Sequence, residues 1–137
     1  MDELERISVI LPVFGEGDSV LEVVGGLHAL VADRLKEIIL IVSPFSPKTT
    51  FSICEEVVSR YPSARISVQK ENPGLGFAIR QGIAEAGGEY ILMMDSDGEM
   101  DVSTVPTMLA VLRERKADLV VGSRWIGGGG AEGYAPI

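Results

Sequence analysis

Two aspartates, Asp95 and Asp97, directly follow five apolar or aromatic residues at positions 90–94. An apolar run of this length is typical of a buried strand in a parallel sheet, and it would place both carboxylates in the loop at the strand's carboxyl end. Two carboxylates this close repel each other unless a cation lies between them, and a divalent ion with oxygen ligands satisfies that need. Such an ion also binds substrate phosphates. The pair therefore predicts a metal–diphosphate site at the end of a central strand.

The residues around this pair leave a second interpretation open. Asp95, Ser96 and Gly98 all favour turns, so the segment could be a solvated turn without a ligand. Glu99 lies two residues beyond Asp97 and could be a further oxygen ligand or an exposed loop acid. As a ligand it would add charge and strengthen the binding of Mg²⁺ or Mn²⁺. Which aspartate lies nearer the ion stays open.

Elements that would position these acids alternate along the chain. Apolar runs predict strands at 7–13, 38–42, 65–69, 89–94 and 119–121, and amphipathic spacing predicts helices at 19–33, 49–61, 74–86 and 102–115. Alternating strands and helices of these lengths give right-handed crossovers and a mostly parallel α/β sheet flanked by helices. Ligands bind such sheets at the carboxyl ends of strands, where the winding reverses. We expect the reversal between the first and fourth strands, which would bring 12–16 beside 95–97.

Two further charged residues could reach a ligand at this edge. Glu16 follows a glycine-containing turn after the first strand and could accept hydrogen bonds from a base or a ribose. It could equally be an acid in the first turn of the next helix. Arg124 follows the last predicted strand and precedes the glycine run 127–130, where its guanidinium could pair with a phosphate in a bidentate way. Its alternative is a surface ion pair.

Composition limits the class of protein. The 137 residues are enough for one domain over 1–137 with a real core, and the glycine-rich segment at about 126–137 predicts a flexible tail. The net charge of −8, without a basic run, argues against nucleic acid as a partner, but less strongly against a membrane surface. Cys54 is the single cysteine, the start lacks the basic region of a signal peptide, and no apolar stretch could span a bilayer. We expect a cytoplasmic protein, acting at the cytoplasmic face of the membrane or through a partner subunit if its substrate is a lipid.

Four segments in this order resemble the family 2 glycosyltransferases of GT-A fold. The segment 8–16 is similar to the family's opening Pro-x-aromatic-x-Glu strand, and 72–78 to its glycine-rich helix start. The segment 95–97 falls on its acidic Asp-x-Asp motif, and 121–125 is similar to a Gly-Ser-Arg-aromatic segment. The last match is closest to the branch that transfers sugars to polyprenyl (dolichyl) phosphates. The resemblance covers almost the whole chain, and the ordered set is far more specific than any one motif.

The resemblance implies a metal-dependent transfer of a hexose from a nucleotide-diphosphate sugar of the GDP-mannose or UDP-glucose type. The implied donor contacts are Pro12, Phe14, Glu16, Asp95 and Ser96; the implied ligands of Mg²⁺ or Mn²⁺ are Asp95, Asp97 and Glu99; and the implied catalytic residues are Asp97 and Arg124. The implied acceptor is a polyprenyl phosphate. A phosphomonoester has a second pKa of about 6, so it is already largely dianionic near neutral pH and needs no carboxylate base.

Two departures from the family pattern keep a different function open. Family members carry acids after the second strand, one of which contacts the nucleoside, whereas the segment Ser43–Pro47 has no acid. The chain also ends at Ile137, where relatives continue, which gives it the appearance of a truncated member. A non-catalytic or truncated nucleotide-sugar-binding module is therefore the alternative. A receiver domain and a dinucleotide-binding domain fit poorly, because the acids of the one and the Gly-x-Gly-x-x-Gly of the other are absent after the first strand.

Overall fold

The computed structural model describes residues 6–15, 17–70, 74–96 and 101–121. The chain divides into two compact units, Met1–Val102 and Ser103–Ile137, which we describe separately. The predicted flexible tail lies outside the described residues, and a single domain over the whole chain stays a prediction.

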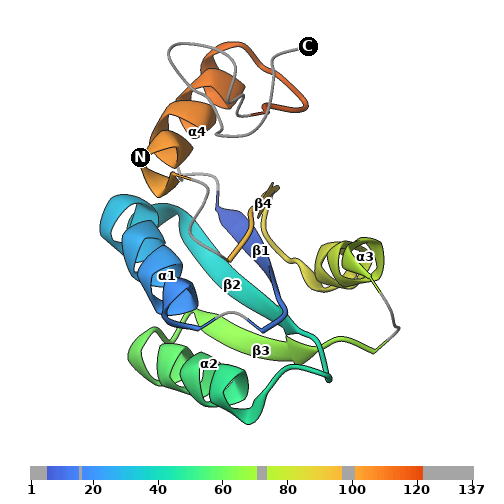
Figure 1. The fold of residues 1–137 in the computed structure, drawn as a ribbon. Helices are drawn as coiled ribbons and strands as arrows, with labels where there is room; N and C mark the ends of the chain where they lie inside the picture. The colour runs from blue at the N-terminus through green and yellow to red at the C-terminus, as the bar shows by residue number, and fades with distance from the viewer. Residues whose placement is uncertain (1–5, 16, 71–73, 97–100, 122–137) are drawn as a thin grey trace, which may run out of the picture. The chain divides into compact units, whose positions relative to one another are not determined.

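Four parallel strands form the sheet of the first unit (Figure 1). They are β1 (Ile7–Val13), β2 (Leu35–Val42), β3 (Ala64–Val68) and β4 (Tyr90–Met93), in the spatial order β3-β2-β1-β4. Each neighbouring pair is parallel, which confirms the predicted α/β class. β4 lies on the far side of β1 from β2, so the winding reverses between β1 and β4, as the sequence predicts.

Helices cover both faces of this sheet. α1 (Asp18–Val31), followed by the short 3₁₀ helix η1 (Ala32–Arg34), packs beside α2 (Lys48–Arg60) on one face. α3 (Leu75–Glu85) packs against β1 and β2 on the other, and Figure 1 shows this arrangement. The chain changes face at α3 because it must return past β1 to reach the position of β4.

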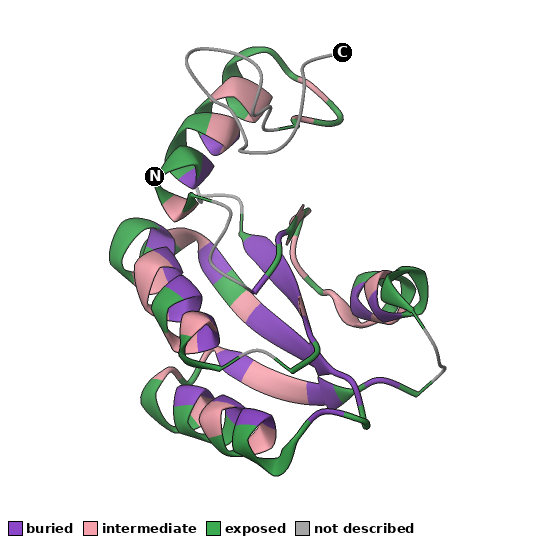
Figure 2. Ribbon diagram, viewed as in Figure 1, coloured by how far each residue is buried: buried purple, intermediate pink, exposed green. Residues whose placement is uncertain are grey.

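The core lies on both faces of the sheet, under α1 and α2 on one side and under α3 on the other, and Figure 2 shows its buried residues concentrated along β1 and β2. Val20, Val23, Val24, Leu27 and Val31 of α1 are buried. Their spacing of three and four residues forms one stripe along the helix, which is why this segment is helical and buries this side. β1 and β2 are covered on both faces, so their sequences are almost continuously apolar.

Two glycines bring the segment from α3 to β4 close to β1. A Cβ on Gly82 would lie 2.5 Å from Cγ2 of Ile10, so only glycine allows α3 this close to the sheet. A Cβ on Gly88 would lie 2.6 Å from the backbone nitrogen of Ser8. The turn before β4 therefore depends on the missing side chain, and it sets where the strand that precedes Asp95 begins.

The prediction that β4 is a buried central strand is wrong for the part of the sheet that the structure describes. β4 is the edge strand there, and Ile91 and Met93 are 42% and 48% exposed. An apolar run is typical of burial on both faces, but α3 packs mainly against β1 and β2, and the side of β4 that carries Ile91 and Met93 stays partly exposed.

After β4 the predicted helix forms, but the predicted last strand does not. The predicted helix 102–115 forms as the 3₁₀ turn η2 (Val102–Thr104) and the helix α4 (Val105–Glu114). The predicted strand at 119–121 does not form, and Leu119 and Val121 are exposed. Within the described residues, no helix is both long and apolar enough to cross a membrane.

Candidate functional site

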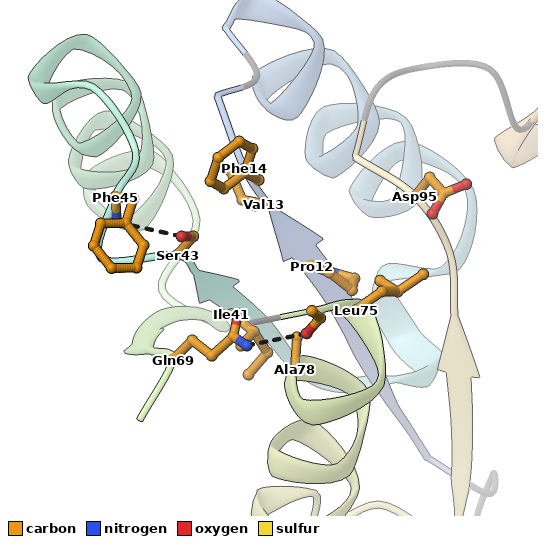
Figure 3. Close-up of a pocket in the computed structure, with 11 residues that line it drawn as sticks. Pro12, Val13, Phe14, Ile41, Ser43, Phe45, Gln69, Leu75, Ala78 and Asp95 are labelled. Carbon is orange, nitrogen blue, oxygen red and sulfur yellow. Dashed lines mark hydrogen bonds between the residues drawn. The ribbon is translucent and has the colours of Figure 1, made fainter. Parts of the chain in front are cut away.

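A cleft of about 540 Å³ opens at the carboxyl ends of the strands (Figure 3). Its lining residues come from all four strand ends and from the start of α3: Pro12, Val13, Phe14, Ile41, Ser43, Phe45, Gln69, Gly74, Leu75, Ala78 and Asp95. This is the edge of a parallel α/β sheet at which ligands bind. The observed cleft therefore occupies the predicted place.

Hydrogen bonds to β1 hold Asp95 at this cleft. The backbone N–H of Met94 donates to the carbonyl of Ile10 (3.3 Å), and Oγ of Ser96 donates to the carbonyl of Pro12 (2.9 Å). Met94 and Ser96 are buried, whereas Asp95 between them is exposed. Successive side chains of an extended segment point in opposite directions, so anchoring the two neighbours turns the Asp95 carboxylate outward.

The end of β2 is tied to β1 in a similar way. The backbone N–H of Ser43 donates to the carbonyl of Val13 (3.0 Å), and the N–H of Phe45 donates to Oγ of Ser43 (3.2 Å). A serine side chain that accepts a hydrogen bond two residues on is a local turn device, and here it fixes the loop that carries Phe45. The side chain of Phe45 is left 69% exposed, and that of Phe14 65%.

Gln69 connects the end of β3 with the start of α3. Its backbone N–H donates to the carbonyl of Val42 (2.9 Å), and its side-chain Nε2 donates to the carbonyl of Gly74 (3.0 Å). Gly74 has a φ of 120°, a conformation that favours glycine, and α3 begins at the next residue. Gln69 therefore positions the first turn of α3 against the cleft.

The structure places some of the predicted site residues and leaves others undescribed. Pro12, Phe14 and Asp95 line the cleft together, although Asp95 is more than 80 positions from the other two in the sequence. Ser96 is buried and bound to the carbonyl of Pro12, so its direct contact with a donor stays a prediction.

The remaining predicted site residues lie outside the described part of the chain: Glu16, Asp97, Glu99 and Arg124.

Sequence reasoning missed Phe45 and Gln69. Gln69 follows β3 directly and Phe45 lies three residues after the end of β2, at the edge where it placed the site, and this position was the signal that could have found them. From the segment Ser43–Pro47, the sequence analysis used only the lack of acids.

The cleft offers one carboxylate for a divalent ion within the described residues. No group of three or more His, Cys, Asp or Glu residues there could hold a metal by itself. Mg²⁺ needs no such cage, because one or two carboxylates, waters and substrate phosphates complete its coordination. The exposed oxygens of Asp95 fit this mode of binding. Asp97 and Glu99, two and four positions after Asp95, lie outside the described residues.

Comparison with models of protein families shows the family to which the chain belongs. The family described as "Glycosyl transferase family 2" matches residues 8–137. The chain belongs to this family.

Two curated relatives match over most of the chain. This chain is 29% identical to a dolichol-phosphate mannosyltransferase of Pyrococcus furiosus. The match covers 94% of this chain and 36% of the relative. The chain is also 29% identical to glycosyltransferase GlyG of Streptococcus pneumoniae, over 87% of the chain and 39% of the relative. The chain thus spans less than two fifths of each relative.

Two solved structures share the fold. A mannosyltransferase from Pyrobaculum calidifontis in complex with GDP-Man and Mn²⁺ superposes with a TM-score of 0.69 at 21% identity, over 80% of this chain and 32% of that one. A glucosyl-3-phosphoglycerate synthase from Mycobacterium tuberculosis, in complex with Mn²⁺, UDP and phosphoglyceric acid, gives 0.63 at 24% identity, over 79% and 39%. With the parallel order β3-β2-β1-β4, these likenesses confirm the GT-A fold.

Proposed function

We propose that this chain is the donor-binding part of a metal-dependent glycosyltransferase that moves a hexose from a nucleotide-diphosphate sugar to a polyprenyl phosphate. The observation that carries the proposal is the cleft at the four strand ends, with the exposed Asp95 carboxylate at its edge. A site for a nucleotide sugar needs an acidic end for the metal and diphosphate and a less polar end for the nucleoside. The lining residues supply both.

The relatives support the donor class. The Pyrobaculum structure holds GDP-Man with Mn²⁺, and the Mycobacterium structure holds UDP with Mn²⁺. Carboxylate oxygens accept either Mn²⁺ or Mg²⁺. These complexes support a donor of the GDP-mannose or UDP-glucose type and a cofactor that is Mn²⁺ or Mg²⁺.

In this mechanism the chain binds and orients the donor. Pro12 and Phe14 form the wall beside the nucleoside. Glu16, which lies outside the described residues, is a further proposed contact of the donor. Asp95 and Asp97, with Glu99, would hold the divalent ion, which when bound would stabilise negative charge on the departing nucleoside diphosphate. Arg124 pairs with a phosphate oxygen of the donor or the acceptor. Ser96 keeps Asp95 beside Pro12 through its hydrogen bond to the Pro12 carbonyl.

The acceptor follows from the chemistry of the nucleophile. A sugar hydroxyl needs a general base, whereas a phosphomonoester with a second pKa of about 6 is already an anion near neutral pH. The dolichol-phosphate mannosyltransferase of Pyrococcus furiosus, 29% identical to this chain, is named for such an acceptor. A polyprenyl phosphate would be reached at a membrane surface or with the help of a partner subunit.

Calorimetric titration with GDP and with UDP, each with Mn²⁺ and then with EDTA, tests the donor site. We expect binding that requires the metal and is lost in Asp97→Ala, a variant that should melt like the wild type. Binding that survives EDTA, or an Asp97→Ala variant of unchanged affinity, would contradict the metal assignment. If neither nucleotide binds, the acidic segment is a turn without a ligand and the proposal fails.

The alternative is a nucleotide-sugar-binding module without transferase activity. It is favoured by the segment Ser43–Pro47, which has no acid. Incubation with GDP-mannose or UDP-glucose, Mn²⁺ and a short polyprenyl phosphate separates the two functions. Formation of the glycolipid supports the transferase, whereas metal-dependent binding without product supports the module.

A further inference from the structure

Two exposed phenylalanines border the cleft. The side chains of Phe14, after β1, and Phe45, after β2, are 65% and 69% exposed, and both line the cleft. Exposed aromatic rings in a concave surface are typical of a ligand site, because binding removes their apolar area from water. Figure 3 shows both rings at the rim, well apart from Asp95.

The order of the strands separates Phe45 from Asp95. Phe45 follows β2 and Asp95 follows β4, and β1 lies between these strands. Neighbouring strands are about 4.8 Å apart, so the two strand ends are about 10 Å apart. A nucleoside diphosphate whose phosphates lie at Asp95 would therefore extend its base towards the aromatic end of the cleft.

Two polar side chains near the rings each make a hydrogen bond within the protein. Oγ of Ser43 accepts the N–H of Phe45, and Nε2 of Gln69 donates to the carbonyl of Gly74. Among the described lining residues, Asp95 is the only one with a charged side chain, and it lies at the other end. The aromatic end thus offers flat apolar surface and few groups for reading the edge of a base.

We infer that Phe45 is a specificity-determining residue, which with Phe14 holds the nucleobase by stacking and makes the site prefer purines while distinguishing guanine from adenine weakly. The inference rests on the proposed donor function and adds the class of nucleoside. Every base has a π face, so stacking tolerates changes at its edge. A purine presents two fused rings to the phenylalanines and a pyrimidine one, so GDP and ADP bind more tightly than UDP and CDP.

Titration of the whole chain with GDP, ADP, UDP, CDP and inorganic pyrophosphate, all with Mn²⁺, tests this inference. The dissociation constants of GDP and ADP should agree within about threefold and lie below those of UDP and CDP. Phe45→Ala should raise the constants of the purine nucleotides by about 5- to 100-fold, the range that base–aromatic stacking gives. It should leave pyrophosphate binding unchanged, because pyrophosphate has no base.

Matched variants separate stacking from other effects. Phe45→Trp should bind purine nucleotides at least as tightly as the wild type, and Phe45→Leu should resemble Phe45→Ala because it keeps apolar bulk but has no ring. Phe77→Ala removes an exposed phenylalanine of α3 that does not line the cleft and should change no affinity.

The outcomes distinguish this inference from the function on which it rests. If the wild type binds nucleoside diphosphates but Phe45→Ala binds them equally well, or if GDP alone binds and ADP does not, stacking specificity is wrong and the donor site stands. If the wild type binds pyrophosphate and no nucleotide, or binds nothing, the donor function fails and this inference fails with it.

Discussion

Carboxylates lie at both ends of the sheet, and their surroundings differ. At the amino ends, on the face covered by α3, Glu37 and Glu85 belong to a network of side chains that bond one another. At the carboxyl ends, Asp95 is exposed at the edge of a cleft. The amino-end network consists of Ser8, Glu37, Arg65 and Glu85, and Ser67 and Gln81 extend it along β3 and α3.

Bonds within the protein satisfy the acids of the amino-end network. Oε2 of Glu37 accepts from Oγ of Ser8 (2.6 Å) and from the backbone N–H of Gly87 (2.7 Å), and Arg65 pairs with both Glu37 and Glu85. Glu85 also accepts from Ser67 (2.7 Å). Acids bonded in this way hold α3 and the turn before β4 to the sheet, and both oxygens of each carboxylate already have a partner within the protein. The comparison teaches that the partners of an acid, more than its presence near a strand end, separate a structural from a ligand-binding carboxylate.

The largest effect that we predict comes from Gly88→Ala at the amino end. The added Cβ would lie 2.6 Å from the backbone nitrogen of Ser8 and 2.9 Å from the carbonyl carbon of Ile7, and backbone atoms of a central strand cannot rotate away. Overpacking of this kind should lower the free energy of unfolding by about 3 kcal/mol, measured by urea denaturation.

Gly76→Ala is the matched control for Gly88→Ala. A Cβ there has no neighbouring atom within 4 Å, and position 76 lies in α3, where alanine favours the helix. We expect no loss of stability. Equal losses in the two variants would mean that the close approach of Gly88 to β1 does not position β4.

The second prediction compares the removal of one carboxylate charge at each end of the sheet. Asp95→Asn should weaken Mn²⁺-dependent GDP binding on the order of 100-fold, equal to about 2.7 kcal/mol, with little change in unfolding. Glu37→Gln should leave GDP binding unchanged and lower stability by about 1–3 kcal/mol, because charge-assisted hydrogen bonds are lost. Calorimetry and urea denaturation on each variant measure both quantities.

Asp33→Asn controls for the loss of one negative charge on an exposed part of the first unit and should change neither quantity. If Asp95→Asn lost as much stability as Glu37→Gln, the distinction between a structural carboxylate at the amino end and a ligand-binding one at the carboxyl end would be wrong.

The sequence predicts the carboxyl end better than the amino end, for a physical reason. A metal or phosphate site gathers acids and glycines within short segments, and the rule that strand ends meet at one edge brings Pro12 beside Asp95. The amino-end network has no such local signature. Ser8 meets Glu37 only because the two are partners in the register of β1 and β2, and Arg65 reaches them from β3.

Errors about single elements have similar causes. The run before Asp95 has the composition of a doubly covered strand, but coverage depends on the placement of α3, which tertiary packing decides. Phe45 was not predicted as a site residue because a phenylalanine in a loop belongs to no sequence motif. Its importance depends on lying in the same cleft as Phe14, which only the fold establishes.

The smallest effect that we predict is the acid sensitivity of the amino-end network. Burial raises the pKa of Glu37, but the hydrogen bonds from Ser8 and Gly87 and the charge of Arg65 together outweigh it, so its pKa lies below the ordinary 4.5. The hydrogen bond from Ser67 is the largest influence on Glu85 and, with Arg65, lowers its pKa as well. Both groups therefore stabilise the fold above pH 4.5, and this contribution is lost as the pH falls through their lowered values.

Urea denaturation between pH 7 and pH 3 measures this loss, and Arg65→Met provides the comparison. Without the guanidinium, both carboxyls should titrate nearer to their ordinary value, so the variant should be less stable at pH 7 by about 1 kcal/mol and lose less stability on acidification. The difference between the two proteins should shrink below pH 4.5, because protonated carboxyls no longer pair with Arg65. Parallel profiles, with a constant difference down to pH 3, would show that Arg65 acts through packing of its side chain and that its charge does not hold α3 to the sheet.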